Sequence, residues 1–231
     1  MLEIRNLTKH YGKKVALRDF SYTFTKGVYG LLGPNGSGKS TFMNTVTDCL
    51  SATSGEVVFD GTDIRKLKGE YRKHYGYLPQ NVGLYSNMTA YENLKYFCSL
   101  RDVPKDKMEE RITYSLEAVN LLSHKDEKVS SYSGGMKRRL TIAVTILADP
   151  EILIFDEPTV GLDPRERHRF KELITSIAKD KIVILSSHIV SDIVETADYV
   201  LFLKEGNLVY QSENKDIDLN KMYLEYFPDT E

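Results

Sequence analysis

One segment of this 231-residue chain constrains its fold more than any other: Gly33-Pro34-Asn35-Gly36-Ser37-Gly38-Lys39-Ser40. It matches the pattern GxxxxGK[ST]. The apolar run 28–32 precedes it without alternation, as is typical of a strand buried on both faces. A helical pattern follows over about 39–50. Strand, glycine-rich loop and helix in this order predict an α/β fold that holds phosphates at the end of a buried strand.

The residue types of the loop suit a polyphosphate. Glycine lets the backbone fold tightly enough for several N–H groups to converge, and the start of the next helix adds free N–H groups and a positive dipole end. Lys39 is expected to contact the β and γ phosphates, and the Ser40 hydroxyl to bind Mg²⁺. The alternative, a turn that binds nothing, leaves the flanking strand and helix unexplained. The predicted nucleotide contacts are Gly33, Pro34, Asn35, Gly36, Ser37, Gly38, Lys39, Ser40 and Thr41.

The rest of the chain predicts one domain with an inserted helical part. Alternating residues near Leu2, Ile4 and Leu7 indicate an edge-type strand in an antiparallel sheet with one wet face. Short apolar runs alternate with helical patterns after residue 150, which predicts a parallel sheet covered by helices. We expect an α/β core at about 1–84 and 149–231, and a helical subdomain at about 85–148. The runs expected as parallel strands are 152–155, 182–185 and 199–203, and the expected helices are 91–100, 105–121, 136–148, 165–178 and 189–196.

Two adjacent acids, Asp156 and Glu157, end one of these apolar runs. In a phosphate-binding α/β fold, the acid at the end of a strand reaches Mg²⁺, and Asp156 fits that role. Glu157 should diverge from Asp156 because side chains alternate along a strand, and it could polarise a water aimed at the γ phosphate. The alternative is that both acids cap the next segment or face solvent.

Ser133-Gly134-Gly135 precedes an amphipathic helical pattern. Ser133 is a good N-cap, and the glycines expose backbone N–H groups. Lys137, Arg138 and Arg139 fall in the first turn, where the helix dipole disfavours cations. A bound anion would relieve this mismatch, which suggests a second phosphate-contacting site. The alternative is a solvated basic face with an incidental serine cap.

Together these residues resemble the ATP-binding cassette (ABC) family over essentially the whole chain, because further motifs follow in the family's order. The motifs beside the phosphate loop are Tyr11 at the adenine position, Gln80 of the Q-loop after Tyr75-Gly76-Tyr77-Leu78-Pro79, Tyr132-Ser133-Gly134-Gly135-Met136 at the signature, Asp156-Glu157, Gly161-Leu162-Asp163 at the D-loop, and His188 after Ser186-Ser187. The resemblance implies a P-loop ATPase core with a mainly parallel sheet, an N-terminal antiparallel β part and an inserted helical subdomain.

The resemblance also implies a mechanism, in which two cassettes sandwich two MgATP molecules between them. Ser133, Gly134 and Gly135 would contact the γ phosphate bound by the other subunit. Glu157 would be the general base, and His188 would hold the γ phosphate and water. Gln80 would contact Mg²⁺ or water, and Tyr11 would stack on adenine. Asp163 would link the two sites, and it should also start the next helix.

One departure from the family pattern concerns the signature, where Tyr132 and Met136 replace leucine and glutamine. The residues that contact phosphate are kept. Methionine followed by Lys-Arg-Arg is similar to bacterial export cassettes.

Net charge and the length of the apolar runs limit the kinds of partner that this chain is expected to bind. A formal charge of -2 gives no reason to expect nucleic acid. No apolar run approaches the about 20 residues of a spanning helix, so a separate membrane permease would form the transport path. We expect a cytoplasmic protein, peripheral on the inner face of the membrane, that pairs with a second cassette as a homodimer or heterodimer.

The expected docking region is 82–96, with apolar area from Tyr85, Met88, Tyr91, Leu94 and Phe97, some of which could be core instead. The alternative functions are an ABC-type ATPase outside transport, for example in cluster assembly, and a P-loop kinase.

Overall fold

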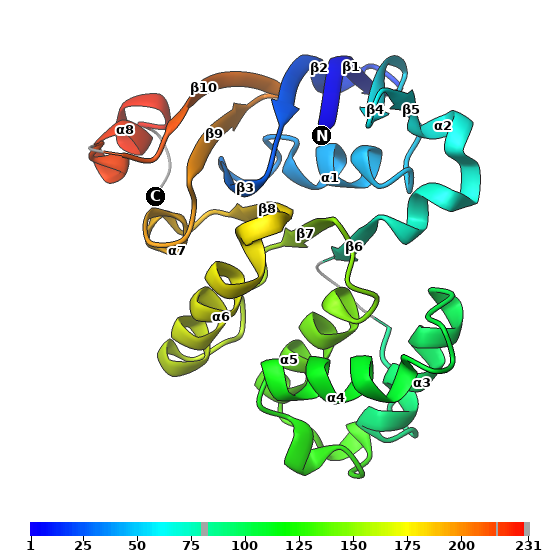
Figure 1. Ribbon diagram of the computed structural model, residues 1–231. Coiled ribbons are helices and arrows are strands. Elements are labelled where there is room, and N and C mark those ends of the chain that lie inside the picture. The colour runs from blue at the N-terminus through cyan, green and yellow to red at the C-terminus, as the bar shows by residue number, and fades with distance from the viewer. Residues whose placement is uncertain (80–82, 216, 229–231) are drawn as a thin grey trace.

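The computed structural model describes residues 1–79, 83–215 and 217–228. Its strands form two sheets, one four-stranded in the order β2-β1-β4-β5 and one six-stranded in the order β10-β9-β3-β8-β7-β6 (Figure 1). The first sheet comprises β1 (Leu2–Tyr11), β2 (Lys14–Phe24), β4 (Ser54–Phe59) and β5 (Thr62–Asp63). The second comprises β3 (Gly27–Leu32), β6 (Tyr75–Leu78), β7 (Ile152–Asp156), β8 (Ile182–Ser187), β9 (Tyr199–Lys204) and β10 (Asn207–Glu213).

The six-stranded sheet is parallel except at one edge. β3 pairs in parallel with β8 and β9, β7 pairs in parallel with β6 and β8, and only β10 is antiparallel to its neighbour. Parallel neighbours need crossover connections, and these include α1 (Lys39–Val46), α6 (Pro164–Ile177) and α7 (Val190–Val194). The carboxyl ends of β3, β7 and β8 therefore meet at one edge, where ligands bind in open α/β sheets. The predicted fold class, with its antiparallel N-terminal part, is confirmed.

Alternate residues of the parallel strands enter two separate apolar cores. Tyr29 and Leu31 of β3 join the core that contains Phe42 of α1, whereas Val28 and Leu32 join the other core. Successive side chains of a strand point to opposite faces of its sheet. Each large apolar side chain that is fully buried contributes about 1.5–3 kcal/mol. The strands are thus held from both sides, which keeps the loops at their carboxyl ends in fixed positions.

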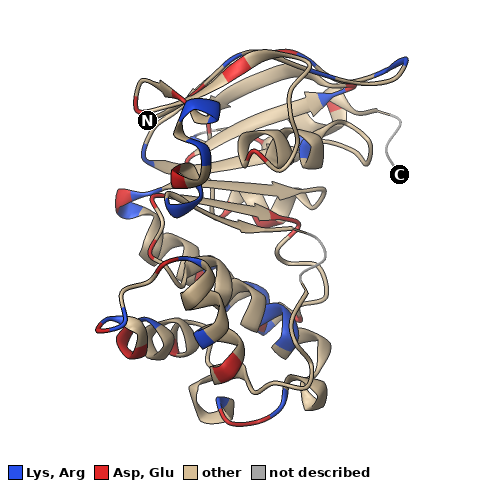
Figure 2. Ribbon diagram, turned by 90° about the vertical axis from the view of Figure 1, so that its right-hand side faces the viewer, with Lys and Arg blue, Asp and Glu red and all other residues tan. Residues whose placement is uncertain are grey.

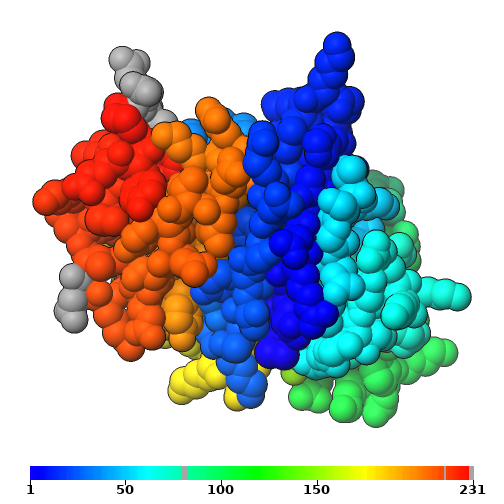
Figure 3. Space-filling model, turned by 90° about the horizontal axis from the view of Figure 1, so that it is seen from above, coloured from blue at the N-terminus to red at the C-terminus, as the bar shows by residue number. Residues whose placement is uncertain are grey.

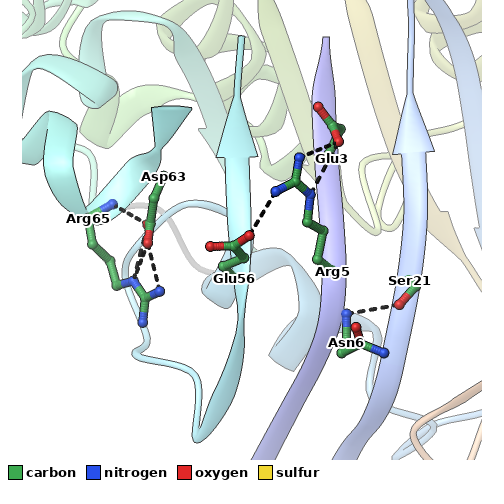
Figure 4. A network of polar contacts seen from close by, with 7 residues as sticks. All are labelled: Glu3, Arg5, Asn6, Ser21, Glu56, Asp63 and Arg65. Atoms are coloured by element: carbon green, nitrogen blue, oxygen red, sulfur yellow. Dashed lines mark hydrogen bonds and ion pairs between the residues drawn. The ribbon is translucent and has the colours of Figure 1, made fainter. Parts of the chain in front are cut away.

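The antiparallel sheet corrects one expectation. The strand predicted as edge-type is β1, and it is an inner strand, paired with both β2 and β4. Leu2 and Ile4 are buried on one face. On the other face, the Arg5 guanidinium contacts Glu3 at 2.8 Å and crosses to Glu56 at 2.9 Å (Figure 4). An inner strand with one wet face has the same alternation as an edge strand, so the pattern could not distinguish them.

The helices between β6 and β7 lie together on the side of the parallel strands away from α1 (Figures 1 and 2). They are α3 (Ala90–Leu100), α4 (Met108–Ala118) and α5 (Gly134–Ile146). Thr89 and Glu92 form a capping box at the start of α3, and Ser133 caps α5, as their sequences favour. The helical nature of this region is as predicted.

The two sheets meet at their edges. Seen from above, β10 lies beside β2 (Figure 3), and the Arg18 N–H donates to the carbonyl of Gly206 at 2.9 Å. The C-terminal α8 (Leu219–Tyr226) lies beyond β10. In the described part of the chain, no helix combines the length and apolar character that a membrane crossing requires. The remaining short helices are α2 (Ile64–Leu67), η1 (Lys68–Lys73), η2 (Leu122–His124), η3 (Val129–Ser131) and η4 (Ala178–Asp180).

Candidate active site

The phosphate loop connects β3 to α1, as predicted. Gly36 and Gly38 have φ angles of 81° and 113°, a region that other residues rarely adopt. A Cβ on Gly38 would lie 2.5 Å from the carbonyl oxygen of Ala16, so only glycine fits there. Gly38 is also the N-cap of α1 and provides no side-chain cap. The N–H groups of the first turn are therefore available to an anion.

Lys39 is the first residue of α1 and is only 6% exposed. Its ammonium donates hydrogen bonds to the carbonyls of Gly33 at 2.5 Å and Pro34 at 3.2 Å. Burial lowers the pKa of Lys39, while the carboxylates of Glu157 and Asp156 raise it. The loop thus holds a positive charge among its own carbonyls, next to the acids at the end of β7.

A cavity of about 410 Å³ opens beside the loop. Tyr11, at the end of β1, lines it and is 50% exposed. The Lys9 ammonium lies 5.3 Å from the centroid of the Tyr11 ring. The structure therefore brings the tyrosine to the same cavity as the loop, with one ring face near a cation. The other lining residues are Lys14, Ala16, Asn35, Gly36, Gly38, Lys39, Ser40, Thr41 and Glu157.

Asp156 and Glu157 are both buried where β7 ends. One oxygen of Asp156 accepts a 2.6 Å hydrogen bond from the Ser186 hydroxyl. That hydroxyl accepts a 2.9 Å bond from the Glu157 N–H. Glu157 has a φ of 50°, which is uncommon for a residue with a side chain and is typical of functional sites. Ser186 therefore joins the two acids, a role that the sequence did not reveal.

His188 follows β8 and lies against Glu157. The His188 Nδ1 and Glu157 Oε2 are 2.9 Å apart. Glu157 is 6% exposed, whereas nearly half of the His188 side chain faces solvent. A buried carboxylate oriented by an imidazole at the rim of a cavity has the geometry of a general base with its positioning partner.

The donors for Mg²⁺ at this edge are oxygens, as that ion prefers. Mg²⁺ commonly takes one or two carboxylates and completes its shell with phosphates and water. Asp156 and Ser40 lie at the ends of β7 and the phosphate loop, and this donor set fits. In the described ranges, no group of three or more His, Cys, Asp or Glu could hold a metal ion by itself. Gln80, the other predicted ligand, lies outside the described residues.

The Ser-Gly-Gly segment is more open than the phosphate loop. The Ser133 hydroxyl accepts a 3.1 Å hydrogen bond from the Met136 N–H, and both Ser133 and Gly134 are exposed. A Cβ on Gly134 would meet nothing within 4 Å, whereas one on Gly135 would lie 2.6 Å from a Glu166 oxygen. Gly134 lines a second cavity of about 770 Å³, which also reaches Asn35, Glu157 and His188.

Asp163 is the N-cap of α6. Its carboxylate accepts a 2.8 Å hydrogen bond from the Glu166 N–H, and Glu166 reaches back to the Asp163 N–H at 3.3 Å. Pro164 occupies the first helical turn. The expectation that Asp163 also starts a helix is confirmed.

The expected mismatch between the start of α5 and the cations Arg138 and Arg139 is wrong, because both residues lie in the second turn and have partners within the chain. Arg138 donates to the carbonyls of Asp156, Glu157 and Pro158. Arg139 donates to carbonyls of the 119–120 turn and pairs with Glu166 at 3.1 Å. The chain itself therefore compensates both cations. These contacts join segments about twenty residues apart, which a local helix-dipole argument could not foresee.

Comparisons with known proteins identify the family that this chain resembles. Residues 17–160 match the protein-family model described as ABC transporter. The lantibiotic transport ATP-binding protein SrtF of Streptococcus pyogenes is 38% identical over 220 residues, which are 92% of this chain and 91% of that protein. The bacitracin transport ATP-binding protein BcrA of Enterococcus faecalis is 35% identical over 231 residues, which are 98% of this chain and 74% of that protein.

A solved structure extends the comparison to the fold. It is a dimeric ATP-binding cassette in a post-hydrolysis state, bound to ADP and Pi. Its TM-score is 0.84 at 23% identity, with 94% of this chain and 100% of that chain covered. At this identity the match establishes a shared fold.

Proposed function

This chain belongs to the ABC transporter family as an ATP-binding and ATP-hydrolysing subunit, and from that premise we propose that it drives a separate membrane permease, in the direction of export. One observation carries the proposed chemistry. The phosphate loop and the Glu157–His188 pair lie at the same edge of the parallel sheet, and Glu157 lines the cavity of the loop. A polyphosphate bound by the loop would thus present its γ phosphate to a buried carboxylate.

We assign the steps of hydrolysis to residues of this edge. The loop N–H groups and Lys39 bind the phosphates. Glu157 accepts the proton of the attacking water, and His188 holds that carboxylate in place through the 2.9 Å contact. Ser186 keeps the Glu157 peptide beside Asp156. Mg²⁺, held by Ser40 and Asp156 with Gln80 as a further proposed ligand, would offset the phosphate charge.

The proposed working form is a pair of cassettes. Ser133 and Gly134 are exposed, and Gly134 has open space around it, so the phosphate of a second subunit can approach them. Gly135 would complete this contact, and Asp163 would link the two sites. The related cassette of known structure is a dimer. Hydrolysis would separate the pair and turn chemistry into motion.

We propose that the permease docks beside α3. Tyr85 and Tyr96 are exposed there, and their rings pack edge to face with centroids 5.0 Å apart. Leu94, counted earlier as docking area, is fully buried and belongs to the core. Docking would place the chain at the cytoplasmic face of the membrane. The signature Tyr132-Ser133-Gly134-Gly135-Met136 and the antibiotic-transport relatives SrtF and BcrA support export.

Glu157→Gln tests the proposed chemistry. The amide cannot accept the proton, so we expect ATP turnover to fall about 100- to 1000-fold while MgATP still binds and an ATP-bound dimer accumulates on gel filtration. Glu151→Gln is the matched control, because Glu151 pairs with His74 at 2.9 Å just before β7, at the opposite end of that strand. Turnover of Glu157→Gln at the level of the control would show that Glu157 is not the base.

A membrane experiment separates the transport role from the alternative ABC-type ATPase. The tagged chain is purified from detergent-solubilised membranes of its natural host, and the accompanying proteins are identified by mass spectrometry. We expect a stoichiometric multi-span protein. Recovery with soluble partners only, and absence from the membrane fraction, would contradict the transport role and leave the nucleotide chemistry standing.

A further inference from the structure

Arg138 connects the signature helix to the catalytic strand. It lies in the second turn of α5 and is partly buried. Its Nη2 donates to the carbonyls of Asp156 at 3.1 Å and Glu157 at 2.6 Å, and its Nε donates to the carbonyl of Pro158 at 3.0 Å. Its Nη1 is 3.5 Å from the carbonyl of Pro79, which directly precedes Gln80. One side chain therefore reaches the backbone of the acidic strand and the start of the Q-loop.

The contacted backbone has an unusual conformation. Glu157 has a φ of 50°, and the carbonyls of three consecutive residues converge on one guanidinium. A guanidinium has five N–H donors in a rigid fork and suits several acceptors at once. Burial lowers the pKa of Arg138, and the charges of Asp156 and Glu157 raise it in opposition. Without Arg138 these partly buried carbonyls would lose its N–H groups, and Glu157 would keep the longer 3.4 Å bond from the Val160 N–H. The left-handed turn at Glu157 would thus lose support.

The position of Arg138 on α5 couples the Ser-Gly-Gly segment to the Glu157 peptide. Arg138 lies four residues after Gly134, a little more than one helical turn. A helical turn is stiff, so a displacement of the Ser-Gly-Gly segment also displaces the Arg138 backbone. The guanidinium then transfers that displacement to the Glu157 peptide, whose N–H is held at 2.9 Å by Ser186 of β8.

We infer that Arg138 is a positioning residue for hydrolysis, because it fixes the peptide that carries Glu157 and ties the position of that carboxylate to the position of α5. The inference rests on the proposed role of Glu157 as the base. Arg138 does not line the cavity of the phosphate loop, and it lines the second cavity together with Gly134 and Glu157. Its loss should therefore lower kcat and leave the KM for ATP nearly unchanged, because the phosphate loop stays intact.

Arg138→Met removes all of these donors and keeps an apolar stem of similar length. We expect kcat to fall about 10- to 100-fold, as for a small misplacement of a catalytic group, with the KM for ATP changed less than about threefold. Arg138→Lys keeps the charge, but its three N–H donors lie on one nitrogen and do not reproduce the planar fork that spans the three carbonyls. Its kcat should lie between those of the wild type and the methionine variant, which would be a partial rescue.

Arg111→Met is the matched control. Arg111 donates to the carbonyls of Ile146 and Leu147 at 3.0 Å and 2.9 Å, so it holds the other end of α5 by the same kind of contact. Both methionine variants should lower the Tm, but only Arg138→Met should lower kcat. Hydrogen exchange at the amides of Glu157 and Thr159 should be faster in Arg138→Met than in the control.

The outcomes separate this inference from the proposed function. If Glu157→Gln hydrolyses ATP at the rate of Glu151→Gln, the proposed role of Glu157 fails. If the wild type is active and Arg138→Met keeps the kcat of Arg111→Met, Arg138 is merely structural and the inference is overturned. If the methionine variant does not fold, Arg138→Lys decides alone: a lowered kcat at unchanged KM supports the inference, and wild-type kcat contradicts it.

Discussion

The chain carries two glycine-containing loops at helix starts, and they differ in how far their own chain completes them. The phosphate loop is closed: Lys39 is buried on the carbonyls of Gly33 and Pro34, and Gly38 packs against Ala16. The Ser-Gly-Gly loop is open, with Ser133 and Gly134 exposed and no atom near the place of a Gly134 Cβ. Both offer backbone N–H groups and a positive helix dipole to an anion.

The two loops therefore differ in how far each is preorganised to bind a phosphate. The first loop can bind phosphates as it stands, because its geometry is set by strands and helices packed on both sides. The second has a capped helix start, but its Ser133 and Gly134 are exposed. In the proposed pair of cassettes, a site built from both would be complete only when two chains bring unlike loops together, and dimerisation would then be part of the catalytic cycle.

The largest expected effect comes from breaking the closed loop. Lys39→Ala removes the charge that the β and γ phosphates are expected to contact, so turnover should fall at least about 1000-fold. Measured by thermal shift, the stabilisation by MgATP should also vanish, because a ligand stabilises only a chain that binds it. Lys26→Ala is the control, since Lys26 precedes β3 at its other end and pairs with Asp180 on the surface. Tight ATP binding by Lys39→Ala would contradict a closed, self-sufficient loop.

A smaller effect is expected at the open loop, and it should appear only in the dimer. Gly134→Asp adds a side chain where the chain has free space, and an acid suits the start of a helix. The Tm of the single chain and its MgATP binding should therefore hold, whereas turnover should fall about 100-fold because a carboxylate faces the partner's phosphate. Loss of ATP binding by the isolated chain would show that this segment serves its own loop.

Mixing the two variants tests whether the two loops of different chains act together. A heterodimer of Lys39→Ala and Gly134→Asp contains one composite site in which both contributing loops are intact. Turnover should therefore recover in the mixture to a measurable fraction of the wild-type rate. If the mixture stays as inactive as the separate variants, either the loops do not combine across chains or hydrolysis at one site requires the other.

The features that the sequence predicts best are those that depend on neighbouring residues. The strand, loop and helix around Gly33–Lys39 could be predicted because glycine conformation, strand burial and the helix start all act within about fifteen residues. The pairing of Glu157 with His188 was not visible in either segment alone, although each residue was placed at a strand end. It arises because β7 and β8 are parallel neighbours, and sheet order depends on packing between distant segments.

The misjudged features share one physical cause. β1 was expected at an edge because its alternation reports a wet face and says nothing of its two neighbours. The sequence predicts a bound anion near Arg138 because it shows only the positive charge near the start of the helix. In the folded chain, backbone carbonyls at the end of β7 and in the following turn accept the hydrogen bonds that an anion would have accepted. Backbone acceptors carry no sequence signature, so such compensation stays hidden until the tertiary structure is known.

The smallest effect is expected at Tyr11, whose side chain lines the cavity beside the phosphate loop. Tyr11 is half exposed at the cavity beside the loop, and a base stacked on an aromatic ring contributes about 1–3 kcal/mol. Tyr11→Ala should therefore raise the KM for ATP roughly tenfold and change kcat little, because the ring is remote from the reacting phosphate. Tyr11→Phe keeps the ring face and should behave like the wild type.

Comparing ATP with GTP shows whether the Tyr11 ring distinguishes one base from another. Stacking tolerates any base with a π face, so the rise in KM of Tyr11→Ala should be similar for ATP and GTP. A larger rise for ATP alone would mean that the hydroxyl or a neighbouring group recognises adenine, and Tyr11→Phe would then also discriminate less. An unchanged KM for both nucleotides would remove Tyr11 from the site and leave the closed loop to bind phosphates without a base platform.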